Sequence, residues 1–209
     1  TTPAVQKVQA YLESKGYEVL VFHATGTGGK CMESLINGGF INGVLDLTTT
    51  EWCDEIAGGV LNAGPDRCSA AALNGVPAVV SVGADDMVNF GPWNTVPEHY
   101  QGRNLYRHNP TVTLMRTTVE ENEKIGHAIA SKVNMSIGPC AVMLPLKGVS
   151  MIDAEGQPFY APEEDAALFK TLGEEIDPTK AELIEIGTHV NDDEFAIAAA
   201  QKLIDLMNK

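Results

Sequence analysis

Residues 17–37 have the sequence YEVLVFHATGTGGKCMESLIN. The β-branched and aromatic run at 17–23 predicts a strand, and the amphipathic stretch from about 29 to 37 predicts a helix. The glycines between them let the backbone approach a ligand without a side chain in the way. A strand, a glycine turn and a helix in this order are typical of an α/β protein with a parallel sheet.

The same alternation continues along the chain and predicts the fold class. Apolar runs predict further strands at 43–47, 77–82, 111–115, 141–144 and 181–186. Helical periodicity predicts the other helices at 3–15, 51–57, 66–74, 119–134, 162–172 and 192–207. We therefore expect a doubly wound, Rossmann-like α/β fold with a mainly parallel sheet of about six strands, helices on both faces, and ligands beyond the carboxyl ends of the strands.

Length and composition favour one α/β domain over residues 1–209, located in the cytoplasm. No apolar run is long enough to span a bilayer, and the N-terminus lacks the pattern of a signal peptide. A formal net charge of −14 with no basic stripe argues against a nucleic-acid partner. The four cysteines have no metal-ligand spacing, so we expect reduced packing residues and no metal. The start at Thr1-Thr2-Pro3, without methionine, suggests one domain of a longer protein.

Two stretches lack regular periodicity and are expected to be loops. The first runs from residue 83 to about 110 and is rich in Gly, Pro, Asn and His; the second runs from 145 to 161. Loops of this length in compact domains are commonly functional, and the aromatic and apolar residues of the first argue against disorder.

The glycine turn is the strongest candidate binding site. Unpaired backbone N–H groups and the helix dipole favour an anion at such a turn, and threonine and lysine side chains can donate to phosphate oxygens. The residues assigned to it are Thr25, Gly26, Thr27, Gly28, Gly29 and Lys30, together called the glycine turn below. The P-loop signature is absent, and Cys31 departs from the dinucleotide fingerprint. A tight strand-to-helix connection is the structural alternative.

Further ligand contacts are expected at other strand ends and helix starts. Asp46 lies twenty residues after Gly26, the spacing of a residue that accepts ribose hydroxyls. The cations Arg67, Arg116 and Lys147 are candidates to neutralise phosphate at the same rim. Helix capping is the alternative for Thr48, which forms a capping-box spacing with Glu51, and for the Asp66–Arg67 pair.

Three residues are candidate acids or bases: Asp85, His108 and His189. Asp85 and His189 follow predicted strands, and His108 lies in the long loop. A solvated turn explains Asp85 equally well, and a lone histidine is commonly structural. No nucleophile elbow or recognisable triad is present, so these residues do not decide whether the chain is an enzyme.

Seven ordered motifs resemble one known family. They are VFHATGTGGKCMESLI, GVLDLTTTE, GGVLNAGPDR, SVGADDMVNFGPWNTVPE, LYRHNPTVTLMRTT, LPLKGVS and HVNDDEF. Together they resemble the C-terminal half of an uncharacterised two-domain ATP-binding family of bacteria, fungi and plants that includes a tomato tobamovirus-resistance protein. The resemblance implies an N-terminal α/β half as a partner and a nucleotide as ligand, without placing it on either half.

The resulting expectation is that the chain binds a nucleotide, such as ATP, or a related anionic small molecule at the glycine turn. One alternative is half of an enzyme site for an anionic metabolite. Another is a non-catalytic assembly domain of a homo-oligomer, in which apolar loop residues such as Phe90 and Trp93 pack on a partner. A dinucleotide oxidoreductase, based on Gly26, Gly28 and Asp46, is a fourth hypothesis.

Overall fold

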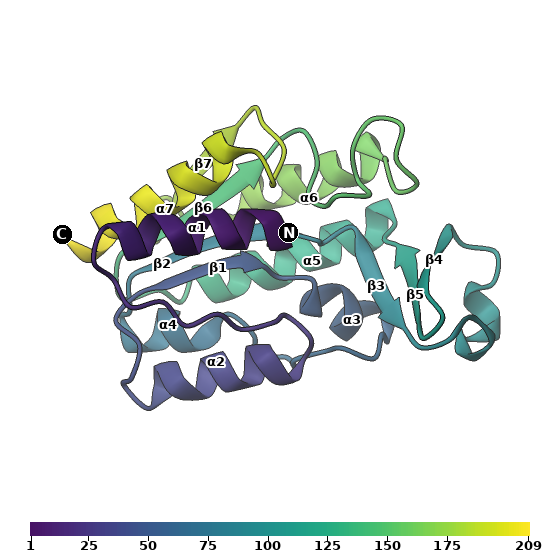
Figure 1. Cartoon of the computed structure of the whole chain (residues 1–209), viewed down its shortest axis with the longest axis horizontal. Helices are drawn as coiled ribbons and strands as arrows, with labels where there is room; N and C mark the ends of the chain where they lie inside the picture. The colour runs from purple at the N-terminus through teal and green to yellow at the C-terminus, as the bar shows by residue number, and fades with distance from the viewer.

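A computed structural model describes all residues, 1–209, and its centre is a parallel sheet (Figure 1). The four strands lie in the order β1-β2-β6-β7. Their bounds are β1 Val44–Thr48, β2 Ala78–Gly83, β6 Cys140–Pro145 and β7 Glu182–Ile186. Because every neighbouring pair is parallel, the carboxyl ends of all four strands form one edge, which faces right in Figure 1. The order never reverses, so the sheet has no topological switch point.

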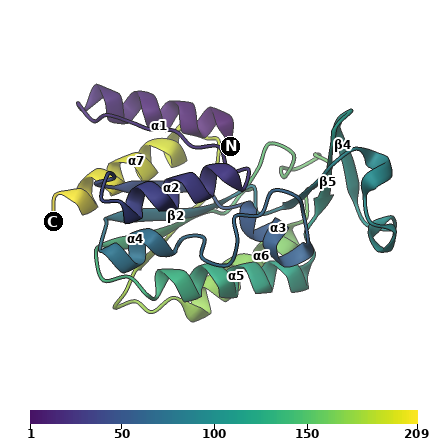
Figure 2. The same ribbon diagram turned by 90° about the horizontal axis from the view of Figure 1, so that it is seen from below.

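Helices cover both faces of the sheet, as expected (Figure 2). Connections between successive parallel strands are normally right-handed, and in a sheet whose strands follow sequence order this places the connecting helices on one face. That face carries α3 Glu51–Ala57, α4 Ser69–Asn74, α5 Val119–Val133 and α6 Pro162–Glu175, whereas α1 Thr2–Ser14 and α7 Asp193–Met207 pack together on the other. Helix α2 Thr27–Asn37, which precedes β1, packs on α4.

Strand alternation divides the buried side chains between the two faces. Val80 and Val142 belong to the larger apolar cluster, under the crossover helices. Their neighbours Val79 and Met143 belong to the smaller cluster, under α1 and α7. Successive strand residues point to opposite faces, so each strand contributes to both cores. The α/β class with a parallel sheet and helices on both faces is thereby confirmed.

A second sheet occupies much of the stretch expected to be a loop. It is antiparallel, in the order β3-β5-β4, and lies beyond the carboxyl edge of the main sheet (Figure 1). Its strands are β3 Met87–Phe90, β4 Leu105–Asn109 and β5 Val112–Arg116, with short 3-10 helices at Trp93–Thr95 and Glu98–Tyr100. The placement of 111–115 in the parallel sheet is therefore wrong. The two residues between β4 and β5 allow only an antiparallel pairing.

The strand predicted at 17–23 is also not formed. These residues follow α1 without entering either sheet. Tyr17 and Val19 instead pack against the α1–α7 cluster, and a cavity separates this segment from β1. The alternating apolar side chains of this segment are thus partly buried against α1 and α7, although its backbone pairs with no strand. The main sheet consequently has four strands rather than about six.

Two further sequence expectations concern the membrane and the cysteines. No helix has the length and apolar character needed to cross a bilayer. All four cysteines are free thiols, and Cys53, Cys68 and Cys140 are buried, whereas Cys31 is exposed. Cys53 and Cys140 pack as small apolar residues, whereas the Sγ of Cys68 lies 3.5 Å from Nη1 of Arg67. The expectation that Cys31 is a packing residue is wrong, because it is exposed.

The α1–α7 layer provides a test of the fold. Phe195 on α7 is fully buried in the smaller cluster, so we expect Phe195→Ala to lower the free energy of unfolding by about 3–5 kcal/mol. The exposed Ile197 on the same helix is the matched control, and Ile197→Ala should cost less than about 1 kcal/mol. Urea denaturation of both variants measures the difference, and equal losses would contradict this packing.

Candidate functional site

The glycine turn has the geometry of an anion site, but a protein carboxylate occupies its inner side. Gly26 has a φ of 82° and precedes the first residue of α2. The backbone N–H groups of Gly26 and Gly29 donate to Oε1 of Glu51, at 2.7 and 3.1 Å. A Cβ at Gly29 would collide with that carboxylate. The glycines are therefore required partly because the turn holds Glu51.

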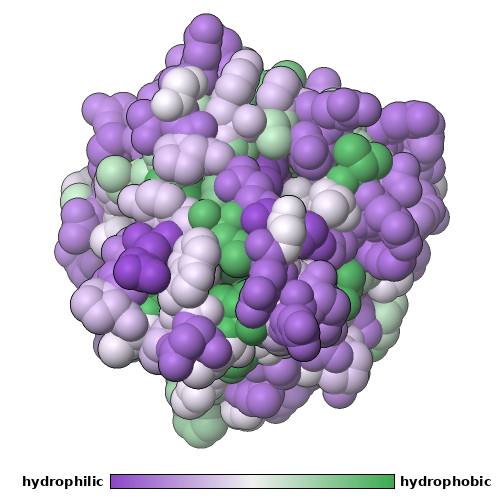
Figure 3. Space-filling view, turned by 90° about the vertical axis from the view of Figure 1, so that its right-hand side faces the viewer, coloured by the Kyte–Doolittle hydropathy of each residue, from purple (hydrophilic) through white to green (hydrophobic).

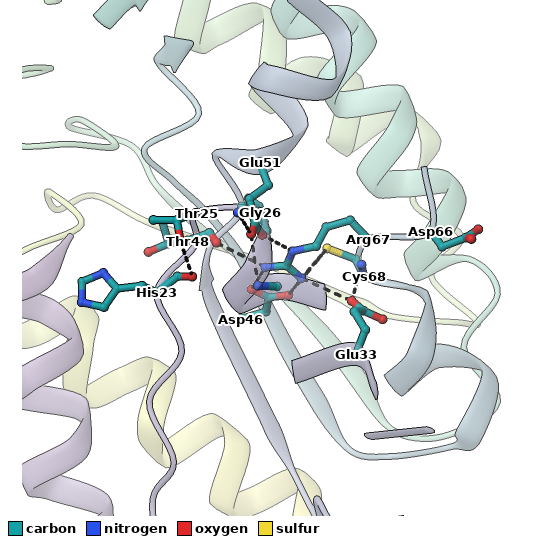
Figure 4. A network of polar contacts seen from close by, with 12 residues as sticks. His23, Thr25, Gly26, Glu33, Asp46, Thr48, Glu51, Asp66, Arg67 and Cys68 are labelled. Atoms are coloured by element: carbon teal, nitrogen blue, oxygen red, sulfur yellow. Dashed lines mark hydrogen bonds and ion pairs between the residues drawn. The ribbon is translucent and has the colours of Figure 1, made fainter. Parts of the chain in front are cut away.

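Arg67 holds this carboxylate in place from the other side (Figure 4). Its Nε donates to Glu51 Oε2, and its two terminal nitrogens form a fork to Asp46, with an Nη2–Oδ1 distance of 2.7 Å. Glu33 lies 3.4 Å from Nη1 and also accepts the N–H groups of Cys68 and Ala70. All four charged side chains are largely shielded from solvent. One guanidinium thus joins α2, β1 and α3.

The local charge balance at this network is negative. Three carboxylates, those of Glu33, Asp46 and Glu51, surround the single cation Arg67. Burial raises the pKa of Glu33, although its backbone hydrogen bonds and Arg67 oppose that rise. A second anion on the inner side would meet this excess charge. The inner face therefore suits a hydrogen-bond donor, such as a hydroxyl group, better than a phosphate.

The outer side of the turn keeps free donors. The N–H groups of Thr27 and Gly28, in the first turn of α2, form no backbone hydrogen bond, and Lys30 is exposed one position beyond Gly29. The His23 ring points away from the Arg67 network, while its carbonyl accepts the Thr25 hydroxyl at 3.4 Å (Figure 4). This outer side is where an anion meets N–H groups and a cation without meeting Glu51.

The turn also closes one end of a cavity of about 600 Å³. The cavity lies between the segment 17–22 and β1, and 16 of its 24 lining residues are hydrophobic, which makes it suitable for an apolar or aromatic group. The polar residues at the turn end are Asp46, Thr48 and Arg67, beside Gly29. We call this space the glycine-turn cavity.

The helix caps expected at Thr48–Glu51 and at Asp66 are not formed. The residue that precedes α3 is Thr50, without a side-chain cap, and Glu51 binds the glycine turn, so the Thr48–Glu51 capping box is wrong. The Thr48 hydroxyl instead donates to that of Thr1. Asp66 is not the cap of α4 either, since its exposed side chain points away from the network (Figure 4) and Cys68 precedes the helix.

A second buried cluster lies at the carboxyl ends of β2 and β5. Arg116 donates to Asp165 at 2.6 Å and to the carbonyls of Phe159 and Ala161, and it lies 3.6 Å from Asp153. It therefore fixes the loop between β6 and α6. The expected approach of Arg116 to the glycine turn is not found, because these contacts engage its guanidinium.

Asp85 and Asp86 enter this cluster directly after β2. Ala84, with a φ of 59°, turns the chain so that both aspartates are fully buried. Asp85 accepts the Thr49 hydroxyl at 2.9 Å, and Asp86 accepts the Ser150 hydroxyl at 2.7 Å. Each has one carboxyl oxygen without a partner.

Burial shifts the acidity of this cluster. It raises the pKa of Asp85 well above its ordinary value and that of Asp86 to about 6, against the opposing effect of Arg116. Burial also raises the pKa of Asp165, against the opposing effect of Arg116. These pKa shifts bring the protonation of the buried aspartates closer to neutral pH, the range in which a general acid or base works. No group of three or more His, Cys, Asp or Glu residues is arranged to hold a metal ion.

The remaining candidates lie in other places. Lys147 and His189 line a separate cavity at the carboxyl ends of β6 and β7. His189 has an Nε2 atom 2.8 Å from the Ser150 carbonyl, and its Nδ1 accepts the N–H of Asn191, so both ring nitrogens have backbone partners. His108 is exposed on β4, in the antiparallel sheet. The structure thus groups Asp46, Thr48 and Arg67 with the glycine turn, and separates the other candidates from it.

A family model and individual relatives of this chain point to the same protein family. The model described as "Uncharacterised protein family (UPF0261) C-terminal domain" matches residues 1–207. A UPF0261 protein of Clostridium tetani is 60% identical over the whole chain, which covers 52% of that protein, and UPF0261 protein RA0729 of Rhizobium meliloti is 50% identical with the same coverage. The ToMV resistance protein Tm-1(GCR237) of Solanum lycopersicum is 46% identical over the whole chain, which covers 28% of its length. The chain thus spans about half the length of these bacterial relatives.

The Glu51 contact yields a stability prediction. Glu51→Ala removes the acceptor of two backbone N–H groups and one partner of a buried guanidinium, so we expect a loss of about 3 kcal/mol in the free energy of unfolding. Glu55→Ala, on the same helix, is the control and should change stability by less than about 0.5 kcal/mol. Chemical denaturation compares them, and similar values for both variants would contradict a structural role for Glu51.

The raised pKa of Asp86 predicts a pH dependence of stability. Because the folded pKa of about 6 exceeds the unfolded value of 3.8, the group's contribution to stability is full below about pH 4 and is lost as the pH rises through 6. Asp86→Asn cannot ionise at this position and therefore avoids the loss. The difference in the free energy of unfolding between the variant and the wild type should shift in favour of the variant by up to about 3 kcal/mol from pH 4 to pH 8. Denaturation at both pH values measures the gain. Asp66→Asn, at an exposed site, is the matched control.

Proposed function

The chain belongs to the UPF0261 family as a C-terminal domain of that family, and we propose that it binds a nucleotide at the glycine turn. In this proposal the base lies in the glycine-turn cavity, the ribose lies at its polar end, and the phosphates lie on the outer side of the turn. The observation that carries it is the apolar cavity of about 600 Å³ that ends at the turn. ATP is the nucleotide implied by the resemblance noted from the sequence.

The apolar walls support the placement of the base. Phe22 comes from the segment before the turn, Leu45 from β1, and Val8 from α1, so three separate elements enclose the space. Its volume falls within the range of about 300–1,000 Å³ common for small-molecule sites. A flat aromatic base gains free energy by leaving water for such walls.

The acidic inner face supports the placement of the ribose. Asp46 lines the cavity, and although both of its oxygens accept from Arg67, a carboxylate oxygen has a further lone pair for a hydroxyl donor. Thr48 adds a polar group next to it. The excess negative charge beside Arg67 disfavours phosphate at this depth and leaves a neutral sugar as the suitable group.

The outer side of the turn supports the placement of the phosphates. The N–H groups of Thr27 and Gly28 have no backbone partner, and α2 directs its positive end toward them. The exposed Lys30 supplies the nearby cation, which the inner face lacks because Arg67 is already engaged. In a chain with a net charge of −14, this local cation is required to hold a polyphosphate.

The proposal separates the phosphate contact from the base contact. Lys30→Gln should weaken ATP binding about five- to tenfold, through the lost charge interaction, and leave adenosine binding unchanged. Isothermal titration calorimetry with ATP, adenosine and inorganic phosphate gives the three affinities. Lys170→Gln, an exposed lysine on α6, is the matched control and should leave all three unchanged.

A second variant tests the cavity. Leu45→Trp fills the space between β1 and the segment 17–22, so it should weaken ATP and adenosine equally. Circular dichroism and a thermal melt check that the variant is folded. Absence of binding of both ATP and adenosine to the wild-type protein at millimolar concentration would overturn the proposal, as would adenosine binding that is unaffected by Leu45→Trp.

A further inference from the structure

A second cavity, of about 710 Å³, opens at the carboxyl ends of β6 and β7. It is bounded by the loop 146–161, the first turns of α6 and Pro3 at the start of α1. We call it the carboxyl-edge cavity. It is separate from the glycine-turn cavity, and no lining residue is common to the two.

This cavity carries a cluster of exposed apolar side chains. Leu146, Met151 and Tyr160, which all line it, are 41%, 64% and 48% exposed. Figure 3, which looks onto the carboxyl end of the sheet, shows apolar side chains exposed among hydrophilic ones on this side of the molecule. Grouped exposed apolar residues with a polar rim are typical of a surface that contacts another protein domain.

The start of the chain lies on the same edge. The Thr1 hydroxyl is bonded to Thr48 at the end of β1, and a Cβ at Gly83, the last residue of β2, would meet the Thr1 methyl group. Asn191, which lines the carboxyl-edge cavity, accepts the Ala4 N–H at 3.3 Å and the Lys7 ammonium at 2.8 Å. The first residues of α1 are therefore fixed beside this cavity.

We propose that the N-terminal half of the full-length protein docks on the carboxyl-edge cavity. The matching family model is that of a C-terminal domain, and the bacterial relatives are about twice as long as this chain. In this proposal a preceding half of that size joins the chain at Thr1, within the edge that bears the exposed apolar cluster. A short connection at this point gives the half a high effective concentration at this surface.

The cavity also defines the chemistry of the docking segment. Apolar side chains of the N-terminal half cover Leu146, Met151 and Tyr160, because these supply the surface to be removed from water. Lys147, exposed at the rim, pairs with a carboxylate or a carbonyl group of the same segment. His189 needs no partner from it, since both of its ring nitrogens are already bonded.

The test uses the full-length protein with a protease site inserted just before Thr1. After cleavage, the two halves of the wild-type protein should co-elute in size-exclusion chromatography. Met151→Asp should weaken their association at least tenfold, because it places a charge in the apolar contact. Ile137→Asp is the matched control, since Ile137 is equally apolar and exposed but precedes β6 at the opposite edge of the sheet, and it should leave association unchanged.

Oxidative footprinting of the same samples gives a second measurement. Met151 and Tyr160 should be oxidised more slowly in the uncleaved protein than after the halves are separated, whereas Met135, exposed near the opposite edge, should not change. The proposal is overturned if Met151→Asp halves associate like wild type, or if Met151 is oxidised at the same rate with and without the N-terminal half. Protection that depends on protein concentration would also overturn it, in favour of a second copy.

Discussion

The buried Arg67 guanidinium is the interaction on which the glycine turn depends. It is the only cation within a group of three shielded carboxylates, and each carboxylate comes from a different element: Glu33 from α2, Asp46 from β1 and Glu51 from α3. Removing one charged partner from such a group leaves the others desolvated and unpaired, which costs more than the pair contributes when intact. The network therefore fixes the relative positions of these elements more than it adds to stability.

A second arginine has the corresponding role at the other side of the sheet edge. Arg116 is the only other buried cation, and it binds Asp165 on α6 together with two carbonyl groups of the preceding loop. Both arginines are thus used inside the protein in a chain of net charge −14. The cations that remain exposed, such as Lys30 and Lys147, are the ones available to a ligand or to another domain.

The sequence predicted the alternation of helices and strands because most elements have clear periodicity, and the helix at 51–57 has the predicted bounds. The sequence-based prediction failed where the structure of a segment depends on which strand or helix it packs against. The run at 17–23 has strand composition but packs on helices, and 111–115 forms a strand in the antiparallel sheet because its partners are β3 and β4. Local composition gives strand tendency, whereas pairing depends on distant residues.

The candidate site shows the same division between local and distant information. Spacing suggested Asp46 and a helix start suggested Arg67, both as contacts to a ligand, whereas in the fold they bind each other. Glu51 was taken for part of a capping box because Thr48 lies three residues before it, but it binds the glycine turn. A carboxylate 25 residues after Gly26 gives no local signal that it will fill the turn. The fold places three carboxylates and a single, fully engaged arginine beside the turn that was expected to bind an anion. This excess of negative charge opposes anion binding on the inner side of the turn.

This arrangement limits the ligands that the turn can hold. An anion that entered from the inside would have to displace Glu51, leaving a buried carboxylate and a guanidinium to find new partners. An anion on the outside meets the free N–H groups of Thr27 and Gly28 and leaves the network intact. Helix α1 lines the glycine-turn cavity with Val5 and Val8 and the carboxyl-edge cavity with Pro3. One helix therefore contributes to the walls of both cavities, although the two share no lining residue.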